Sequence, residues 1–534
     1  MKNQRDIRDI VEGFVARLRP LETAVNRAWW DAAVTGESGA YGRLEGLRNE
    51  IDRLYLDPAL FDRLGAARSS GPEDPLLART IELLYLEALP RQVDPALGER
   101  INRLATGIER EFSTYRPVYR GEERTANDLD RVLKTEADQD LRREAWEALK
   151  AVGSRVAPRL HELVGLRNEA ARSVGYPDFY HLRIALLEQR PDEMADFLDR
   201  LDALTGDPFR RLKADIDAYL GERRGVAPGS LQAWHYGDQF FQEMPDLFGA
   251  DLDGVYARTD IVDAAHRFFD GIGLPVAHIL ARSSLHEAPG KDPHAFAIDV
   301  DREGDVRILL NLRPNERWMG TTLHELGHAV YDDGIDRDLP WILRRPAHTL
   351  TTEAIAMLFG RLSRDSHWMR EMGVVEPDEA ERLADAVARE IRATMLVFAR
   401  WVQVMARFER DLYADPDQDL NALWWSLVER FQGVRPPPRP ADAADYAAKI
   451  HVVIAPVYYH NYLLGECFAS QIDARLRAEV LNGGASYSGR PAVGAWLTER
   501  IFRSGARDHY DALARSATGE AVGPGAMAAQ FFTD

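Results

Sequence analysis

The sequence predicts a mainly α-helical protein with one small β-sheet, and three observations support this prediction. Apolar residues recur with the helical period along most of the chain. One short region, residues 294–312, breaks that period. No Gly/Ser tract, charge block or low-complexity run divides the 534 residues. We therefore expect a single domain over residues 1–534 rather than the three or four domains that roughly 100–200 residues per domain would give.

Two segments show the helical period most clearly. In the first, residues at i, i+3, i+4 and i+7 spacing share one face: Ile7, Ile10, Val11, Phe14, Val15 and Leu18. The second begins after Pro377 with acidic residues and ends before Asp415 and a proline. Its apolar content widens around Met395–Met405, which predicts a helix that is buried through its middle. The proline-rich stretch Gly433–Tyr446 indicates a loop between helices.

The region that breaks the helical period is HAFAIDVDREGDVRILLNL, from His294 to Leu312. It has two short β-favouring runs on either side of DREGD. This pattern predicts a hairpin with Gly304 in the turn. The hairpin would form a small sheet just before the sequence HELGH.

The composition argues against several classes of partner. A formal net charge of −19 disfavours nucleic acid, whose binding needs clustered Lys and Arg. No run approaches the roughly 18 apolar residues of a membrane span, and the charged N-terminal segment lacks the apolar stretch of a signal peptide. The single cysteine, Cys467, allows no internal disulfide. We expect a cytoplasmic protein with neither a nucleic-acid nor a membrane partner. The sequence gives no oligomeric state.

The HELGH sequence spans His324 to His328. Two histidines four apart on a helix point the same way and can both reach one cation. Imidazole is a preferred zinc ligand, and a catalytic zinc site has three protein ligands and one open position. Glu325 lies where it can take a proton from the attacking water. The alternative is an ordinary helix with two hydrogen-bonded histidines.

A third ligand is expected downstream of this motif. The stretch HTLTTEAIAMLFGRL offers Glu353 on a second helix. Alone, Glu353 would be an ordinary first-turn glutamate that complements the helix dipole. Beside HELGH, it is the candidate for the third ligand.

The segment HELGHAVYDDGIDRDLPWILRRPAHTLTTEAIA, residues 324–356, resembles the zinc site of the angiotensin-converting-enzyme-like dipeptidyl carboxypeptidases. These enzymes are related to the thimet oligopeptidases and oligoendopeptidases. In the family a Leu-Pro, an Arg-Arg and a zinc-binding glutamate follow HExxH. Here Leu339-Pro340, Arg344-Arg345 and Glu353 stand in those places.

The resemblance implies one Zn2+ ion held by His324, His328 and Glu353, with Glu325 as general base and acid. It also implies a single large ellipsoidal helical domain. Two halves of that domain would flank a deep central channel, with the small β-sheet next to the zinc site.

The HAFAID sequence resembles the family's His-Ala-x-Ala-x-Asp strand. The resemblance implies that the backbone at Ala295 pairs with an extended peptide and that His294 contacts the group being cleaved. An exposed strand edge is a template for an extended chain in any fold. The alternative is a plain hairpin with a surface histidine.

The stretch AAKIHVVIAPVYYHNYLLGE resembles the family's Lys-x-His followed by two tyrosines three apart. The resemblance assigns Tyr462 and His451 to stabilising the oxyanion, and Lys449 and Tyr459 to holding the substrate's C-terminal carboxylate. The spacing is one residue longer than expected, so Tyr458 is an alternative to Tyr459. We expect the tyrosines on a helix after Pro456. The alternative role for them is core packing with hydroxyls at the rim.

The same resemblance places Gln242, in WHYGDQFFQEMPDLF, in the carboxylate pocket. A buried carboxylate needs a charge partner and hydrogen bonds. Gln242 with Lys449 and a tyrosine would therefore favour peptides with a free C-terminus.

Three departures from the family pattern have consequences. Met357 stands where the family has an aspartate that hydrogen-bonds a ligand histidine, and loss of such an acceptor typically weakens metal affinity or activity about 10- to 100-fold. Asn461 replaces an arginine that binds chloride, so we predict no chloride activation through that site. The family's disulfide-forming cysteines are absent.

These observations predict a zinc metallopeptidase that cleaves short peptides and releases C-terminal dipeptides. One alternative is an endo-acting oligopeptidase of the oligoendopeptidase or thimet type. Another is a carboxypeptidase that removes single residues. A third is a peptide-binding scaffold that has lost catalysis.

Overall fold

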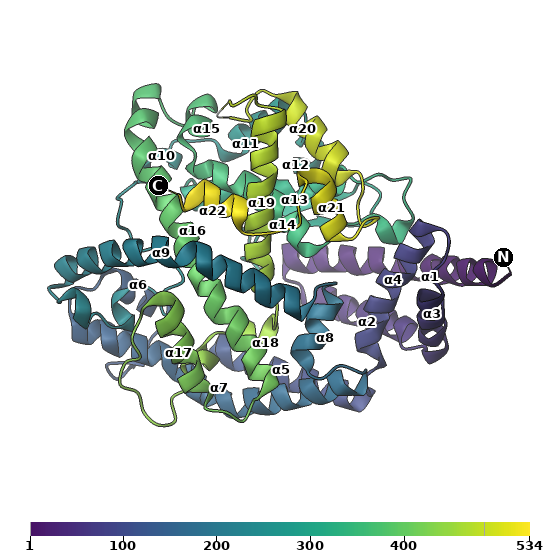
Figure 1. The fold of residues 1–534 in the computed structure, drawn as a ribbon, viewed down its shortest axis with the longest axis horizontal. Helices are drawn as coiled ribbons and strands as arrows, with labels where there is room; N and C mark the ends of the chain where they lie inside the picture. Colours follow the sequence, from purple (N-terminus) through teal and green to yellow (C-terminus); the bar gives the residue numbers. More distant parts are fainter. Residues whose placement is uncertain (1, 485, 534) are drawn as a thin grey trace. The chain divides into compact units, whose positions relative to one another are not determined.

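The computed structural model describes residues 2–484 and 486–533. Within them the protein is mainly α-helical, with two short two-stranded sheets (Figure 1). The predicted fold class is therefore confirmed. None of the helices in the described ranges is both long enough and apolar enough to cross a membrane.

The chain forms two compact units, and each is built from separated stretches of sequence. Unit 1 comprises Met1–Gln92, Ala250–Ala388 and Leu464–Ala526. Unit 2 comprises Val93–Gly249, Arg389–Leu463 and Met527–Asp534. Three of the five boundaries between the units fall inside helices, namely α16 (Pro377–Ala414), α19 (His460–Glu479) and α22 (Gly525–Phe531), whereas those at residues 92–93 and 249–250 interrupt no helix or strand. The single domain over residues 1–534 stays a prediction.

Unit 1 contains the small sheet β3–β4 and most of the short helices. Its elements are α1 (Lys2–Thr35), α2 (Ser38–Tyr55), α3 (Pro58–Ser70), α4 (Pro75–Ala88), η1 (Leu89–Gln92), α10 (Leu252–Tyr256), α11 (Ile261–Gly271), α12 (Ala277–Leu280), β3 (Phe296–Asp299), β4 (Val306–Leu309), α13 (Glu316–Asp333), η4 (Trp341–Leu343), α14 (Thr349–Gly360), η5 (Arg361–Arg364), α15 (Ser366–Glu371), α20 (Pro491–Leu497), η7 (Thr498–Phe502) and α21 (Tyr510–Thr518).

Unit 2 is organised around long helices. Its elements are α5 (Pro95–Thr114), β1 (Val118–Tyr119), β2 (Glu122–Glu123), α6 (Ala126–Thr135), α7 (Gln139–Ser173), α8 (Phe179–Leu186), α9 (Pro191–Arg224), η2 (Pro228–Ser230), η3 (Ala233–His235), α17 (Leu420–Gln432), η6 (Asp445–Ala448) and α18 (His451–Ile454). The helix α7 packs against α5, α6, α8 and η6.

The two helices with the clearest sequence period are present. Residues of the first lie in α1, and the second is α16, which begins at Pro377 and ends at Ala414 as predicted. Trp401 and Met405 in α16 are fully buried, which confirms a helix buried through its middle. The proline-rich loop is also confirmed, because α17 ends at Gln432 and η6 begins only at Asp445.

The predicted hairpin is confirmed as the antiparallel pair β3–β4. Ala297 lies opposite Ile308, and Asp299 lies opposite Val306. Gly304 in the turn has φ +107°, a left-handed conformation that favours glycine. Both strands pack against α13, so the sheet lies directly beside the helix that carries HELGH.

The helices α13 and α14 pack closely side by side (Figure 1). At their contact, a Cβ atom on Gly327 would lie 2.7 Å from the Cα of Ala356 and 3.1 Å from its backbone nitrogen. Only a residue without a side chain allows this approach. The glycine inside HELGH therefore sets the spacing between the helix of the two histidines and the helix of Glu353.

We predict that Gly327→Ala destabilises the protein by about 1–3 kcal/mol, because the added methyl group must push α14 away. Thermal or denaturant unfolding measures this change. The matched control is Gly13→Ala in α1, where an added Cβ meets no atom within 4 Å. That control should be neutral or stabilising by about 1 kcal/mol. Equal stability of the Gly327 variant and the wild type would contradict a tight α13–α14 contact.

Candidate metal centre and peptide-binding residues

The helix α13 places His324 and His328 on one face. It begins after Asn315, whose side-chain oxygen accepts a hydrogen bond from the amide of Trp318 at 3.0 Å. This N-cap satisfies one of the open amides of the first turn. The helix then continues without a break to Asp333, so residues four apart project in the same direction.

The helix α14 brings Glu353 to the same place. It is capped by His348, whose Nδ1 accepts from the amide of Leu350 at 2.9 Å, while the His348 amide donates to the Thr351 hydroxyl at 3.2 Å. No acidic residue lies in the first turn of α14. Glu353 is therefore not the first-turn glutamate that the alternative interpretation requires.

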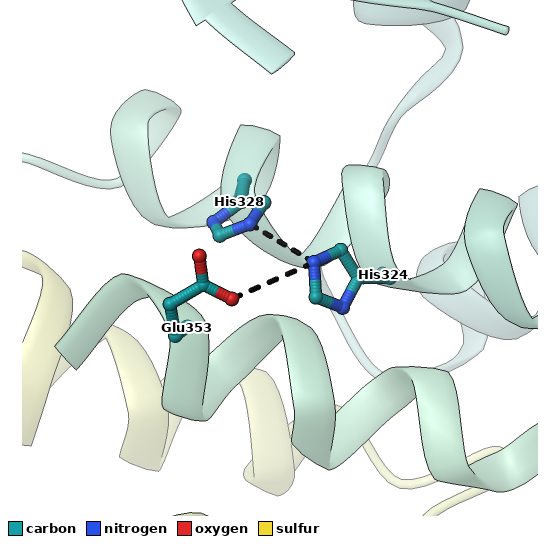
Figure 2. Close-up of side chains that lie close together, drawn as sticks. All are labelled: His324, His328 and Glu353. Carbon is teal, nitrogen blue, oxygen red and sulfur yellow. Dashed lines mark hydrogen bonds and ion pairs between the residues drawn. The ribbon is translucent and has the colours of Figure 1, made fainter. Parts of the chain in front are cut away.

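Figure 2 shows the three side chains converging from the two helices. The Nε2 atoms of His324 and His328 are 3.2 Å apart, and Nε2 of His324 lies 3.7 Å from Oε2 of Glu353. Candidate ligand atoms of all three residues lie within 4.8 Å of one another. Atoms bound to a tetrahedral zinc at about 2.0–2.1 Å lie about 3.3 Å apart, so the observed spacing fits this ion.

The protonation states of these groups also suit a metal. Burial lowers the pKa of His324 to about 4. Burial and the neighbouring His324 hold the pKa of His328 well below its ordinary value. Both imidazoles are therefore neutral at pH 7, which is the form that binds a cation. Burial, with a smaller contribution from Glu466, raises the pKa of Glu353 to about 7, so a bound cation would displace the remaining proton.

Glu325 points toward the hairpin rather than to solvent. Burial first, and repulsion by Glu353 second, raise the pKa of its carboxyl group to about 8, while a hydrogen bond from the amide of Ala297 opposes this shift. A bound cation would lower this pKa by direct attraction. The carboxyl group thus lies between the candidate metal ligands and β3, where it can accept and return a proton.

The edge of β3 beside Glu325 has backbone groups that do not pair with β4. The amide of Ile308, opposite Ala297, donates to the Ser283 hydroxyl at 2.8 Å instead of to β3. In an antiparallel pair such a position is not hydrogen-bonded across the strands, so the Ala297 backbone faces the other way. Ala295, two residues earlier and just before β3, is the predicted pairing position, and this role stays a prediction.

His294 lies at the entrance of the same strand. Its side chain is 87% exposed, and its Nδ1 is 3.1 Å from Oδ1 of Asp292. The Asp292 carboxylate also accepts from the His294 amide at 2.8 Å, so it orients the ring. His294 is therefore accessible, as a residue that contacts substrate must be, and its contact with the group being cleaved stays a prediction.

Unit 2 brings together the predicted carboxylate-binding residues. The Nζ of Lys449 donates to Oε1 of Gln242 at 2.6 Å, and it lies 5.5 Å from the ring centre of Tyr459 and 5.2 Å from that of Trp401. Burial lowers the pKa of Lys449 to about 8, against the attraction of Asp238 and Glu243. No carboxylate of residues 2–484 and 486–533 is in hydrogen-bond contact with this buried ammonium, which makes it a candidate site for an anionic group.

Two local arrangements hold this lysine and glutamine in place. The Asp238 carboxylate accepts from the amides of Phe240 at 2.7 Å and Gln242 at 3.1 Å, which fixes the loop that carries Gln242. Before Lys449, the buried Asp445 accepts from Nε1 of Trp425 at 2.9 Å and pairs with Arg439 at 2.8 Å. Hydrogen bonds thus order both the loop that carries Gln242 and the segment that precedes Lys449.

The prediction for the tyrosines is partly wrong. The helix α19 begins at His460, so Tyr462 lies on it, whereas Tyr459 lies in the turn that precedes it. The ring of Tyr459 nevertheless packs 5.6 Å from that of Tyr462 and 5.3 Å from that of His451. The Tyr459 ring lies 5.5 Å from Nζ of Lys449, and the choice between Tyr459 and Tyr458 stays a prediction.

His451 begins the short helix α18. Burial, with a smaller effect of Lys449, lowers its pKa to about 4, so the ring is neutral at pH 7. Its buried Nδ1 has no hydrogen-bond partner within the described part of the chain. A neutral imidazole has one donor and one acceptor nitrogen, and this ring therefore keeps hydrogen-bonding capacity for a ligand.

The departures from the family pattern have distinct structural outcomes. Asn461 is fully buried, and its Oδ1 accepts from Gln189 at 2.8 Å. Oε1 of Gln189 lies 2.7 Å from Nε2 of His460. Asn461 is thus part of an amide and imidazole network, and the predicted absence of chloride activation stays a prediction. Met357 packs where a Cβ on Gly465 would meet its sulfur at 3.2 Å.

Sequence reasoning missed one residue beside the metal cluster. The hydroxyl of Thr352 lies 2.6 Å from Nδ1 of His328. Its position next to Glu353 was the available signal, but a threonine inside a helix is ordinarily read as a surface or packing residue. Its contact with the other helix appears only in the folded protein.

Two family models match the chain. The one described as angiotensin-converting enzyme matches residues 246–489, which include the candidate metal centre. The one described as peptidase family M3 matches residues 132–256. The matches overlap at residues 246–256 and together span residues 132–489.

Similar curated proteins are also found. The angiotensin-converting enzyme of Oryctolagus cuniculus is 23% identical over 451 residues, which cover 78% of this chain and 33% of that protein. The angiotensin-converting enzyme of Rattus norvegicus is 24% identical over 487 residues, which cover 84% of this chain and 34% of that protein. The chain thus spans about a third of the length of these relatives.

We predict that the protein stripped with a chelator and reloaded binds one zinc ion per chain, and that His328→Ala abolishes this binding. Elemental analysis after gel filtration measures the metal content. The control is His266→Ala, because His266 on α11 pairs with Asp270 on its own helix at 3.3 Å and is not part of the candidate metal centre. An His328 variant that keeps stoichiometric zinc would place the metal elsewhere.

Proposed function

We propose that the chain hydrolyses short peptides and releases dipeptides from their C-terminal ends, because the matches support a zinc peptidase of the angiotensin-converting-enzyme-like and M3 group. The observation that carries the proposal is the convergence of His324, His328 and Glu353 beside the buried Glu325. Two neutral imidazoles and a carboxylate are the donor set of a hydrolytic zinc site.

A bound zinc ion would supply a Lewis acid that polarises the scissile carbonyl group. The chain's own residues do the remaining work. Glu325 takes the proton of the attacking water and returns it to the leaving amine, because its carboxyl group lies between the candidate metal ligands and β3 and a bound cation would favour its ionised form. The edge of β3 at Ala295 holds the peptide in an extended form through backbone hydrogen bonds.

We assign two further roles from the family resemblance. Tyr462 and His451 donate hydrogen bonds to the oxyanion that forms as water adds to the carbonyl. His294 contacts the group being cleaved, as its exposure permits. These roles are proposals. They are tested by measuring kcat for Tyr462→Phe, His451→Gln and His294→Gln.

The C-terminal cleavage register rests on Lys449, Gln242 and Tyr459. The 2.6 Å contact between the lysine and the glutamine amide leaves other hydrogen atoms of the ammonium group for a ligand. A peptide carboxylate would complete this buried charge, whereas an amidated or internal peptide segment would not. We therefore propose short free-acid peptides as substrates.

We also propose a cytoplasmic location, in keeping with the single cysteine.

The test is mass spectrometry of products from one peptide prepared with a free and with an amidated C-terminus. We expect release of dipeptides from the free acid, loss of cleavage with a chelator, and recovery when zinc is restored. Glu325→Gln should bind zinc and lower kcat by several orders of magnitude, since the general base is lost.

The other outcomes identify the alternatives. Internal cuts in both peptides would make the protein an endo-acting oligopeptidase, and release of single residues would make it a carboxypeptidase of another register. Equal, negligible hydrolysis by the wild type and the Glu325 variant would indicate a peptide-binding scaffold.

We also predict a pH dependence from Lys449. Its pKa is lowered to about 8, so the ammonium is charged below pH 8 and is lost as the pH rises through 8. The KM for a free-acid peptide should therefore rise above pH 8, while the KM for an amidated peptide stays level. Lys449→Ala should raise the free-acid KM about 10- to 100-fold at pH 7, the value of a charge-assisted hydrogen bond of about 1.5–3 kcal/mol.

Lys449→Arg is the matched variant, because a guanidinium keeps its charge over this pH range. It should remove the rise in KM between pH 8 and pH 9. A KM profile of the wild type that is the same for free and amidated peptides would rule out Lys449 as the carboxylate partner.

A further inference from the structure

We propose that Thr352 is a positioning residue for the metal: its hydroxyl accepts the Nδ1 hydrogen of His328 and holds the ring with Nε2 toward the ion. Thr352 would do the work of the carboxylate that the family places at position 357. The inference rests on the proposed metal centre. We assign Thr352 no other role in binding metal or substrate.

The geometry of His328 supports this role. Its two ring nitrogens have different surroundings: Nε2 faces Nε2 of His324 at 3.2 Å, and Nδ1 faces Oγ1 of Thr352 at 2.6 Å. The ring is thus held between a candidate ligand on its own helix and a hydroxyl on α14. A hydrogen bond of 2.6 Å is at the short end of the normal range.

The chemistry fixes the direction of this hydrogen bond. A nitrogen that binds a metal must be unprotonated, so a neutral imidazole that binds through Nε2 carries its hydrogen on Nδ1. The Thr352 oxygen has lone pairs to accept that hydrogen. Ligand histidines generally give their second ring hydrogen to such an acceptor, which fixes both the tautomer and the ring orientation.

The placement of Thr352 couples the two ligands of the site. It directly precedes Glu353 on α14, so one turn of helix supplies both a metal ligand and the group that orients a ligand on α13. Met357 is one turn further along and packs toward Gly465. A thioether is only a weak acceptor, so the methionine is a poor substitute for a carboxylate, whereas the threonine is already in contact.

A hydroxyl differs from a carboxylate in charge. It orients the imidazole without adding a negative charge behind it, so the site retains more of the cation's positive charge. The hydrogen bond is correspondingly weaker than a charge-assisted one. The chain therefore has the orientation that a ligand histidine needs without the additional anion.

The test compares zinc dissociation constants, measured by competition with a chromogenic chelator, for the wild type, Thr352→Val and Thr352→Ser. Valine has nearly the same shape without the hydroxyl, and we expect it to weaken zinc binding about 10- to 100-fold. Serine keeps the hydroxyl and should bind within a few-fold of the wild type. The d–d spectrum of the cobalt-substituted protein should change with valine and be retained with serine.

The matched control is Thr322→Val on α13. Its buried hydroxyl donates only to the carbonyl of Trp318 at 2.7 Å within the helix, so zinc affinity should not change. The melting temperature of the metal-free protein separates positioning from folding. We expect metal-free Thr352→Val to melt near the wild type, with the stabilisation by added zinc reduced.

Two results would overturn the proposal. One is a Thr352→Val variant that binds zinc as tightly as the wild type. The other is a serine variant as weak as the valine variant, because the hydroxyl would then be irrelevant. Neither readout uses peptide hydrolysis, so a wild type that binds zinc and cleaves no peptide would defeat the proposed function alone.

Discussion

The close contact of α13 with α14 is the constraint on which the candidate metal centre depends. The absence of a side chain at Gly327 lets the two helix backbones meet near Ala356. That distance brings Glu353 to His324 and Thr352 to His328. A larger separation would break both contacts together, because one helix contributes the histidines and the other contributes their partners. A second glycine, Gly465 on α19, approaches Glu353 from another side, where an added Cβ would lie 3.0 Å from that of Glu353.

Burial gives these groups their chemical character. The same desolvation that lowers the pKa of both histidines raises the pKa of Glu325 and Glu353. Each group is thus held near its neutral form, and a divalent cation is the species that would restore charge to the carboxyl groups. In unit 2 the buried group is a base, Lys449, and an anionic ligand would favour its charged form. In both sites burial disfavours the charged form of a side chain, and a ligand of opposite charge would favour it.

Local patterns predicted much of this structure. The spacing of His324 and His328 needs only helical geometry, and the hairpin needs only two β-favouring runs with Gly304 between them. Glu353 became a candidate only beside HELGH, and then through the resemblance, because nothing local distinguishes it from an ordinary helical glutamate. Tyr459 shows why the remainder escaped. Val457 has φ +54°, and its amide donates to Oε1 of Glu409 at 2.8 Å, so the chain turns before α19 begins. That partner is remote in sequence, as Thr352 is from His328, and neither contact has a local signature.

The single cysteine lies in α19, two residues beyond Gly465, and it is fully buried. A thiol reagent in solution can modify Cys467 only in those molecules in which this part of α19 has opened. The rate of labelling therefore reports how often the support beside Glu353 is lost, without any introduced probe. If zinc slows the labelling of Cys467, this part of α19 opens less often when the ion is bound. The ion would then stabilise the packing of α13 and α14 against α19.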